Sequence, residues 1–218
     1  MKTSYLLVLA MLLQGLASAQ TKLEEGDLLF CIAKENNNIT DVTQGVSEAK
    51  IDHVAILHWQ NGKAFALEAI HKGVVLTPLD SFLCRNDSMV AVGRLRDTTG
   101  VAASVKRAMS FVGRPYDFLF MPGNDAFYCS ELVQTNYLDK CGKPVFAPIP
   151  MSFHDKTGKV TTFWKEYYSK RNQEVPEGKP GSNPGNLSQS DKIRIVYWFK
   201  TKNKQRKLTG RKASDNDT

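Results

Sequence analysis

The feature that most constrains the fold of this chain is an Asn-Gly pair, Asn61-Gly62, between two runs of alternating character, DHVAILHW (52–59) and KAFALEAI (63–70). Asn-Gly joins antiparallel strands through a two-residue type I′ turn, because both residues accept positive φ angles. The pattern therefore predicts a β-hairpin made of these two runs. A two-residue turn also fixes which residues of the two strands face each other.

This register brings a histidine and a carboxylate to one face of the hairpin. If Gln60 pairs with Lys63, Glu68 becomes the diagonal neighbour of His53. Diagonal neighbours lie roughly 7–8 Å apart between backbones, within reach of a long side chain. We therefore expect a His53–Glu68 pair, with a satisfied core histidine as the alternative. A one-residue bulge in the turn would place the two on opposite faces. His58 falls on the other face, where we expect a structural or surface role.

The remaining segments change their hydrophobic period along the chain. Further strands are expected at 26–33, 73–79, 89–96 and 193–200. Helical spacing of apolar residues predicts helices at 101–113, 130–142 and 161–170. Loops or irregular segments are expected at 34–50, 80–88, 146–153 and 177–186. Strands followed by helices, rather than strict alternation, favour an α+β domain with a mostly antiparallel sheet.

Cys129, in the stretch FYCSELV (127–133), lies where the predicted helix 130–142 begins. A helix N-terminus and a nearby imidazolium both favour the thiolate form of a cysteine, which is the nucleophile. The free N–H groups of a first helical turn can also donate to a developing oxyanion. With His53 and Glu68, this arrangement is typical of acyl transfer by a Cys–His–acid triad. The alternative is a buried cysteine that packs at the start of a helix.

The other cysteines and histidines are interpreted as structural or solvated. Cys31 lies inside a strand and Cys141 at the end of a helix, so we expect both to be buried, and Cys84 is expected in a loop. The four cysteines permit disulfides but do not define a pattern. No CxxC motif or cysteine–histidine cluster has metal-ligand spacing, so no metal site is expected. His71 and His154 are expected to be solvated.

The two ends of the chain carry compositional signals. Residues 1–19 have a lysine, a short apolar run and a small-residue cleavage site, the layout of a secretory signal peptide cleaved after Ala19. We therefore expect a secreted or periplasmic protein with one domain at 20–200 and no transmembrane segment. The formal net charge is +7. A basic tail at 201–218 is expected to be disordered, with binding to an anionic partner as the alternative.

Five short motifs together resemble a known family: GDLLF (26–30), DHVAI (52–56), Glu68, RPYD (114–117) and DAFYCSELV (125–133). They are similar to the circularly permuted, papain-like cysteine amidases and peptidases of the NlpC-type superfamily, in particular the YiiX/YebB-like group. The order histidine, acid, cysteine is the order of the permuted branch. The resemblance implies a circularly permuted papain-like fold, with a mostly antiparallel sheet packed against helices.

The resemblance also assigns roles to residues. Cys129 would be the nucleophile, His53 the base and then the acid, and Glu68 the group that orients the imidazole. Three further residues fall on motif positions and would support the site: Tyr128, Asp27 and Tyr116. Tyr128 would help to hold the oxyanion or the substrate carbonyl. No cofactor is implied.

The expected function is therefore that of an exported cysteine hydrolase that cleaves an amide bond, with peptidoglycan stem peptides as the leading substrates. A lipid or N-acyl amide hydrolase or acyltransferase on the same fold is one alternative, although the related acyltransferases usually have a second histidine where this chain has Glu68. A non-catalytic binding module is another. No nucleic-acid partner is expected, and the sequence leaves the oligomeric state open.

Overall fold

The computed structural model describes residues 23–86, 89–121 and 123–200. Its main element is a six-stranded sheet in which all neighbouring strands are antiparallel. The strands, in their order across the sheet, are β4 (Gly73–Pro78), β3 (Lys63–Ile70), β2 (Ile51–Gln60), β1 (Leu28–Ile32), β5 (Met89–Leu95) and β8 (Ile193–Lys200). A small second sheet pairs β6 (Ile149–Pro150) with β7 (Pro180–Gly181). The predicted signal peptide (1–19) and basic tail (201–218) lie outside the described residues.

The hairpin of β2 and β3 has the predicted turn and register. Asn61 and Gly62 have φ angles of 51° and 72°, as a type I′ turn requires. Gln60 pairs with Lys63, and the ladder continues to the pair of Ile56 and Leu67. The turn therefore sets the alignment of the two strands on which the site is built.

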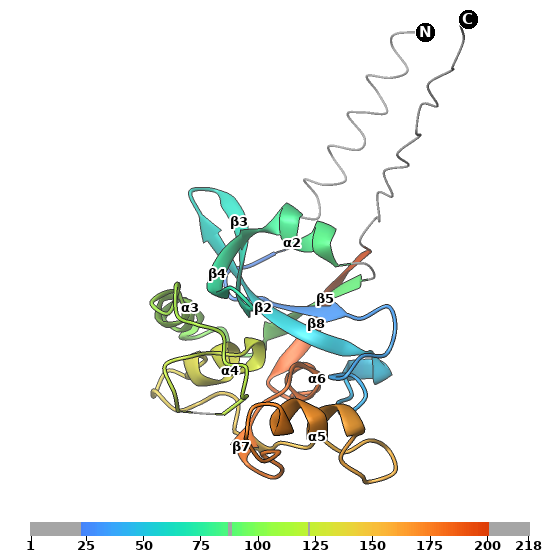
Figure 1. Cartoon of the computed structure of the whole chain (residues 1–218). Coiled ribbons are helices and arrows are strands. Elements are labelled where there is room, and N and C mark those ends of the chain that lie inside the picture. The colour runs from blue at the N-terminus through green and yellow to red at the C-terminus, as the bar shows by residue number, and fades with distance from the viewer. Residues whose placement is uncertain (1–22, 87–88, 122, 201–218) are drawn as a thin grey trace, which may run out of the picture.

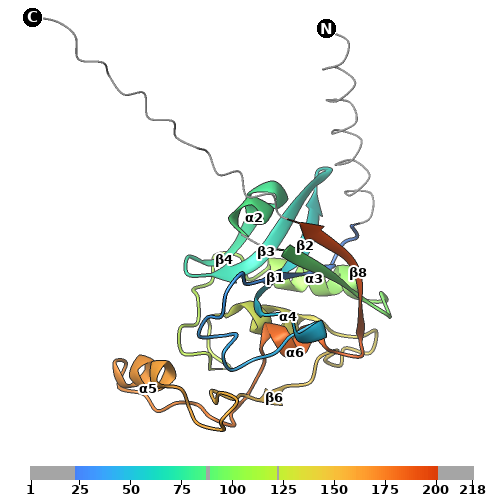
Figure 2. The same ribbon diagram turned by 90° about the vertical axis from the view of Figure 1, so that its right-hand side faces the viewer.

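Helices cover both faces of the sheet, so the α+β class is confirmed (Figures 1 and 2). The elements are α2 (Leu79–Arg85), α3 (Val101–Met109), α4 (Cys129–Asn136), α5 (Thr162–Ser169), α6 (Pro184–Ser188) and a 3₁₀ turn, η1 (Val46–Glu48). Both views place α2 on one side of the sheet, and α3, α4 and α6 on the other. In both, α5 lies farthest from α2, beyond α4 and α6.

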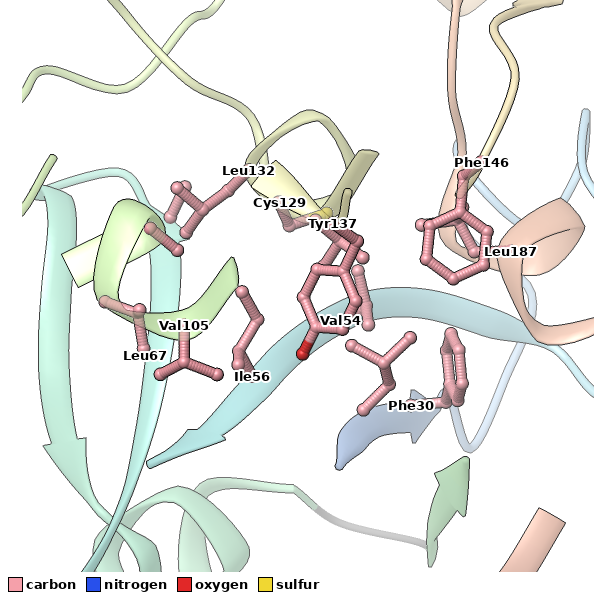
Figure 3. Packing of buried hydrophobic residues seen from close by; sticks show 14 of the residues in the cluster. Phe30, Val54, Ile56, Leu67, Val105, Cys129, Leu132, Tyr137, Phe146 and Leu187 are labelled. Carbon is pink, nitrogen blue, oxygen red and sulfur yellow. The ribbon is translucent and has the colours of Figure 1, made fainter. Parts of the chain in front are cut away.

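The core has a layer on each face of the sheet. Figure 3 shows the larger layer, where Val105 of α3 and Leu132 of α4 pack towards Ile56 and Leu67 of the sheet. The smaller layer lies under α2 and includes Phe82. A third cluster of apolar side chains lies outside the sheet, beneath α5. Within the described residues, no helix has the length and apolar character needed to cross a membrane.

The expected loop at 80–88 is wrong, because residues Leu79–Arg85 form α2. Leu79 and Phe82 of this helix are buried at i and i+3, so burial of one narrow apolar edge stabilises the helix against the sheet. Cys84 is therefore on a helix, and its side chain is exposed. The short helix matters for the site because it also carries Arg85.

The helix predicted at 130–142 ends early, at Asn136. The next residue, Tyr137, is buried, and its hydroxyl donates a 2.7 Å hydrogen bond to the carbonyl of Gly26. This anchor turns the chain out of the helical path, so that Cys141 lies in an exposed turn and not in the core. The expectation of a buried Cys141 is therefore wrong, whereas the buried Cys31 is confirmed. All four cysteines are free thiols.

Two other boundaries differ from the prediction. The helix at 101–113 ends at Met109. The loop expected at 177–186 contains the start of α6, whose N-cap is Asn183. The Asn183 side chain accepts the N–H of Asn186 at 2.7 Å, and a proline at the first helical position favours the helix.

Candidate active site

Strands β2 and β3 bring His53 and Glu68 together. Nε2 of His53 lies 2.7 Å from Oε2 of Glu68. The His53 side chain is 19% exposed and the Glu68 side chain is fully buried. The two residues lie just beyond the end of the ladder at Ile56 and Leu67, so their link is made by side chains.

Two further side chains hold the Glu68 carboxylate. Thr77 of β4 donates its hydroxyl to Oε1 at 2.6 Å, and Arg85 of α2 donates to Oε2 at 2.6 Å. Burial alone would raise the pKa of Glu68, but hydrogen bonds from His53, Arg85 and Thr77, together with the charge of His53, lower it to about 2. The carboxylate is therefore fixed and ionised, as a group that orients an imidazole must be.

Cys129 is the first residue of α4 and is 6% exposed. Tyr128 before it has an extended backbone and forms the N-cap, so the thiol lies at the positive end of the helix. The helix packs on β2 and β3, and Cys129 lies close enough to the imidazole of His53 for the two groups to interact. Since Nε2 of His53 faces Glu68, Nδ1 is the nitrogen that remains for the sulfur.

The electrostatics of His53 favour its protonated form. Burial lowers the pKa of His53, but hydrogen bonds and charge interactions with Cys129 and Glu68 outweigh this effect and raise the pKa to about 10. An imidazolium between a carboxylate and a thiol stabilises the thiolate in return. The three groups can therefore act as a nucleophile, a proton carrier and an orienting acid.

The three predicted supporting residues have different environments. Tyr116 lies close enough to Cys129 for the two to interact electrostatically. Burial is the main cause that raises the pKa of the Tyr116 hydroxyl, and the interaction with Cys129 raises this pKa further. Tyr128 lines the pocket beside Cys129, but its hydroxyl accepts the N–H of Ser182 at 3.1 Å. The structure thus gives the Tyr128 hydroxyl a role in holding the segment that carries Ser182. Its contact with a substrate carbonyl stays a prediction.

The structure does not bring Asp27 to the site. Its buried carboxylate accepts two hydrogen bonds from Arg94, at 2.7 and 2.8 Å. Asp27 precedes β1 at the end away from Cys31, the residue that pairs with His53. Cys31 lies four positions after Asp27, roughly 13 Å along an extended chain at about 3.3 Å per residue. The motif position therefore marks a structural ion pair at the far end of the strand.

The other histidines lie outside the triad. Nδ1 of His58 is 2.7 Å from a carboxylate oxygen of Glu25, which agrees with the expected structural role. His71 is exposed, as expected. His154 is partly buried rather than fully solvated, and lies 3.1 Å from Glu177.

Sequence reasoning missed Arg85 and Thr77, which both bind Glu68. Thr77 was detectable in principle, because strand register places it near the carboxylate: Glu68 pairs with Val75. Arg85 was hidden by the assignment of its segment to a loop. The amphipathic edge formed by Leu79 and Phe82 was the available signal for the helix.

A pocket opens beside Cys129, on the side of α4 towards α5. Its cavity volume is about 60 Å³, within a wider space of about 500 Å³ that includes open solvent. Its walls come from the 34–50 segment, from Phe120 and from residues 151–184, in addition to the start of α4. Of the described residues, none at 80–86 lines it.

The family model of the permuted papain-like amidases of the YaeF/YiiX type, the C92 family, matches residues 22–197. The chain belongs to this family. It is 28% identical over 144 residues to the uncharacterized protein YiiX of Escherichia coli K12, covering 64% of this chain and 69% of that protein. The crystal structure of YiiX from E. coli O157:H7 superposes with a TM-score of 0.67 at 23% identity, covering 81% of this chain and 97% of that one. The permuted papain-like fold is therefore confirmed, in a family of enzymes that act on amide bonds.

The solved relative is described as a metalloprotein. In this chain, the described residues contain no group of three or more histidines, cysteines, aspartates and glutamates that could hold a metal ion. The potential metal ligands at the site are the thiol of Cys129, the imidazole of His53 and the carboxylate of Glu68. This carboxylate already accepts hydrogen bonds from His53, Thr77 and Arg85. These residues do not fit a metal centre, and no step of the reaction below uses one.

Proposed function

We propose that the protein hydrolyses an amide bond through Cys129, His53 and Glu68. The observation that carries the proposal is the placement of His53, with Nε2 2.7 Å from a buried carboxylate and the imidazole beside a thiol at a helix N-terminus. This is the arrangement that a nucleophile, a general base and an orienting group require.

In the first half of the reaction, the sulfur of Cys129 attacks the carbonyl carbon of the substrate. The thiol proton passes to His53, and the carbonyl oxygen gains negative charge as the S–C bond forms. Backbone N–H groups at the start of α4 point towards this oxygen as donors. The C–N bond then breaks, and His53 gives its proton to the departing amine. The acyl group remains on Cys129 as a thioester.

In the second half, water attacks the thioester carbon. His53 takes a proton from the water, the S–C bond breaks, and the carboxylic acid leaves. The proton on His53 is then again shared with the Cys129 sulfur. Glu68 keeps Nε2–H of His53 in place throughout, so that Nδ1 always faces the sulfur.

The proposed setting is outside the cytoplasm, and the leading proposed substrates are cell-wall peptides. Residues 1–19 have the layout of a cleaved signal peptide, and the chain has a net charge of +7, which suits an anionic polymer. An N-acyl amide is the second candidate. It is favoured by the apolar walls of the pocket beside Cys129.

The reactivity of Cys129 tests the proposal, with two cysteines of the same chain as controls. Cys84 and Cys141 are exposed, whereas Cys129 is buried. At pH ~6, well below the reference pKa of about 8.5 for a free thiol, iodoacetamide should modify Cys129 faster than either exposed thiol. His53→Ala should remove this advantage. The rates are measured by peptide mass spectrometry.

Turnover of an amide substrate should follow the same pattern. Cys129→Ala should abolish it with the fold intact, while Cys141→Ala, which alters an exposed position outside α2, α4, β2 and β3, should leave it unchanged. A Cys129 that reacts no faster than Cys84, in a protein without turnover, would instead identify a binding module on this fold.

A further inference from the structure

The walls of the pocket beside Cys129 are mostly apolar. Seven apolar side chains line it: Ile39, Val42, Phe120, Met151, Phe153, Trp164 and Pro184. None of the described residues around the pocket carries a formal charge. A carboxylate or ammonium group that entered would lose its water without meeting an opposite charge, which is strongly unfavourable.

The polar side chains of the pocket are already hydrogen-bonded within the protein. They are Thr43, Tyr128, Ser130, Ser152, Ser182 and Asn183. For example, the hydroxyls of Ser130 and Ser182 bind each other at 3.0 Å. Asn183 accepts the N–H of Asn186 and so serves as the cap of α6. A polar ligand would therefore have to compete for these groups, whereas an apolar ligand leaves them undisturbed.

The aromatic part of the wall is rigidly built. The ring of Phe120 lies edge-on to Trp164 at 5.7 Å and to Tyr128 at 5.4 Å between ring centroids. Trp164 in turn lies edge-on to Phe153 at 5.1 Å. Phe120 has a φ angle of 53°, a backbone conformation that non-glycine residues rarely adopt. Such strain persists where the surrounding packing holds the residue in place, often at ligand sites.

We infer that this pocket is an acyl-binding subsite, and that the substrate is an amide whose acyl group is an uncharged, apolar chain. The inference rests on the proposed function, because it places the carbonyl carbon at the Cys129 sulfur. The acyl side is assigned because the thioester keeps the acyl group beside Cys129, a pocket-lining residue, through both halves of the reaction, whereas the amine departs. Among cell-wall peptides, the inference therefore selects those with an uncharged, apolar group on the acyl side of the cleaved bond.

Acyl 4-nitroanilides of increasing length test the inference with the full chain. From acetyl to octanoyl, kcat/KM should rise about fourfold per methylene until the pocket is full, since each buried methylene contributes about 0.8 kcal/mol. The butyryl and succinyl compounds form a matched pair that differs by a terminal carboxylate. Succinyl should be slower on the order of a hundredfold or more. Equal rates for this pair, or a gain that follows the length of the amine in alkyl amides instead, would overturn the inference.

Val42 offers a variant with an isosteric control. It is a half-buried wall residue, so a substitution there is compatible with folding. Val42→Asp places a carboxylate in the pocket and should flatten the dependence on acyl length, while Val42→Thr should retain most of it. A length dependence that is equally steep in Val42→Asp would show that the acyl chain binds elsewhere.

Binding to an inactive variant separates this inference from the proposed function. Octanamide should bind to Cys129→Ala and change the fluorescence of Trp164, and Trp164→Phe in the same background should remove the change. Saturable binding without any hydrolysis by the wild type would overturn the proposed chemistry and support the subsite. Hydrolysis that is independent of acyl length, without octanamide binding, would overturn the subsite and leave the chemistry in place.

Discussion

At the scale of single residues, Glu68 is the most constrained group in the site. One of its oxygens accepts hydrogen bonds from both His53 and Arg85, and the other accepts one from Thr77. The carboxylate therefore has little freedom to rotate or to take up a proton. The Arg85 side chain is 42% exposed and bridges this buried charge to the surface.

Arg85 is a positioning residue, and its removal should affect the pH profile more than the fold. Arg85→Met should lower kcat/KM by about fivefold at most, since a half-exposed ion pair is worth up to about 1 kcal/mol. Because the Arg85 hydrogen bond lowers the pKa of Glu68, its loss should also move the acidic limb of the kcat/KM profile to higher pH. Arg85→Lys should restore part of both effects. An unchanged acidic limb would limit Arg85 to packing.

The lowered pKa of Glu68 predicts how stability depends on pH. A carboxyl whose folded pKa is depressed contributes stability that is complete above its unfolded value, near 4.5, and is lost as the pH falls towards about 2. The unfolding free energy of the wild type should thus exceed that of Glu68→Gln on the order of 2 kcal/mol above pH ~4.5. The difference should shrink below that pH. His53 stays protonated throughout this window, because its pKa is raised.

Urea denaturation at several pH values measures this difference. Glu166→Gln, which alters an exposed carboxylate of α5, is the control and should change stability little at any pH. A gap between wild type and Glu68→Gln that is independent of pH would assign the loss to packing and not to charge.

At the scale of secondary-structure elements, the β2–β3 hairpin positions both His53 and Glu68. Gly62 has a φ angle of 72° with open space around its Cα. Gly62→Ala should therefore lower stability by about 1 kcal/mol through backbone strain alone, without a steric clash. Thermal unfolding checks this value, and the alkylation rate of Cys129 should be unchanged. A reduced rate would mean that the turn also controls the alignment of His53 with the thiol.

The hairpin also explains what the sequence could predict. Its turn has a chemical signature that fixes the register, so the meeting of His53 with Glu68 follows from a few local residues. The helix that begins at Cys129 is equally local. In contrast, α2 is short and fully buries only Leu79 and Phe82, and polar residues such as Asp80 and Ser81 lie between them, so its sequence resembles a loop. The wrong placement of Asp27 arose because a motif position carries no information about which end of a strand faces the site.

At the scale of the whole molecule, the site and its pocket combine segments that are far apart in sequence. The hydrogen bond between Ser182 and Tyr128 joins residues 54 positions apart, and that between Trp164 and Asn38 joins residues 126 positions apart. No local sequence pattern indicates such long-range contacts. The pocket could therefore not be predicted from the sequence.

This assembly predicts opposite changes at two cysteines on unfolding. The proposed activation of Cys129 depends on α4 and His53, whereas Cys31 is buried in β1 and shielded by the sheet. In increasing urea, the alkylation rate of Cys129 should fall to that of an ordinary thiol, while that of Cys31 should rise. Both changes should share the midpoint of global unfolding. Separate midpoints would show that the helix of Cys129 opens before the sheet.

His53 and Glu68, which share a hydrogen bond, are only 15 positions apart in the sequence, whereas Cys129 lies 76 positions after His53. Short loops close fast and at low entropic cost, and long ones close later. We therefore expect the acid–base half of the site to form early in folding, while the sulfur arrives only when the distant helix docks. A chain truncated before that helix lacks Cys129, and in a chain that is still folding Cys129 has not yet reached His53. In both cases the proposed thioester cannot form.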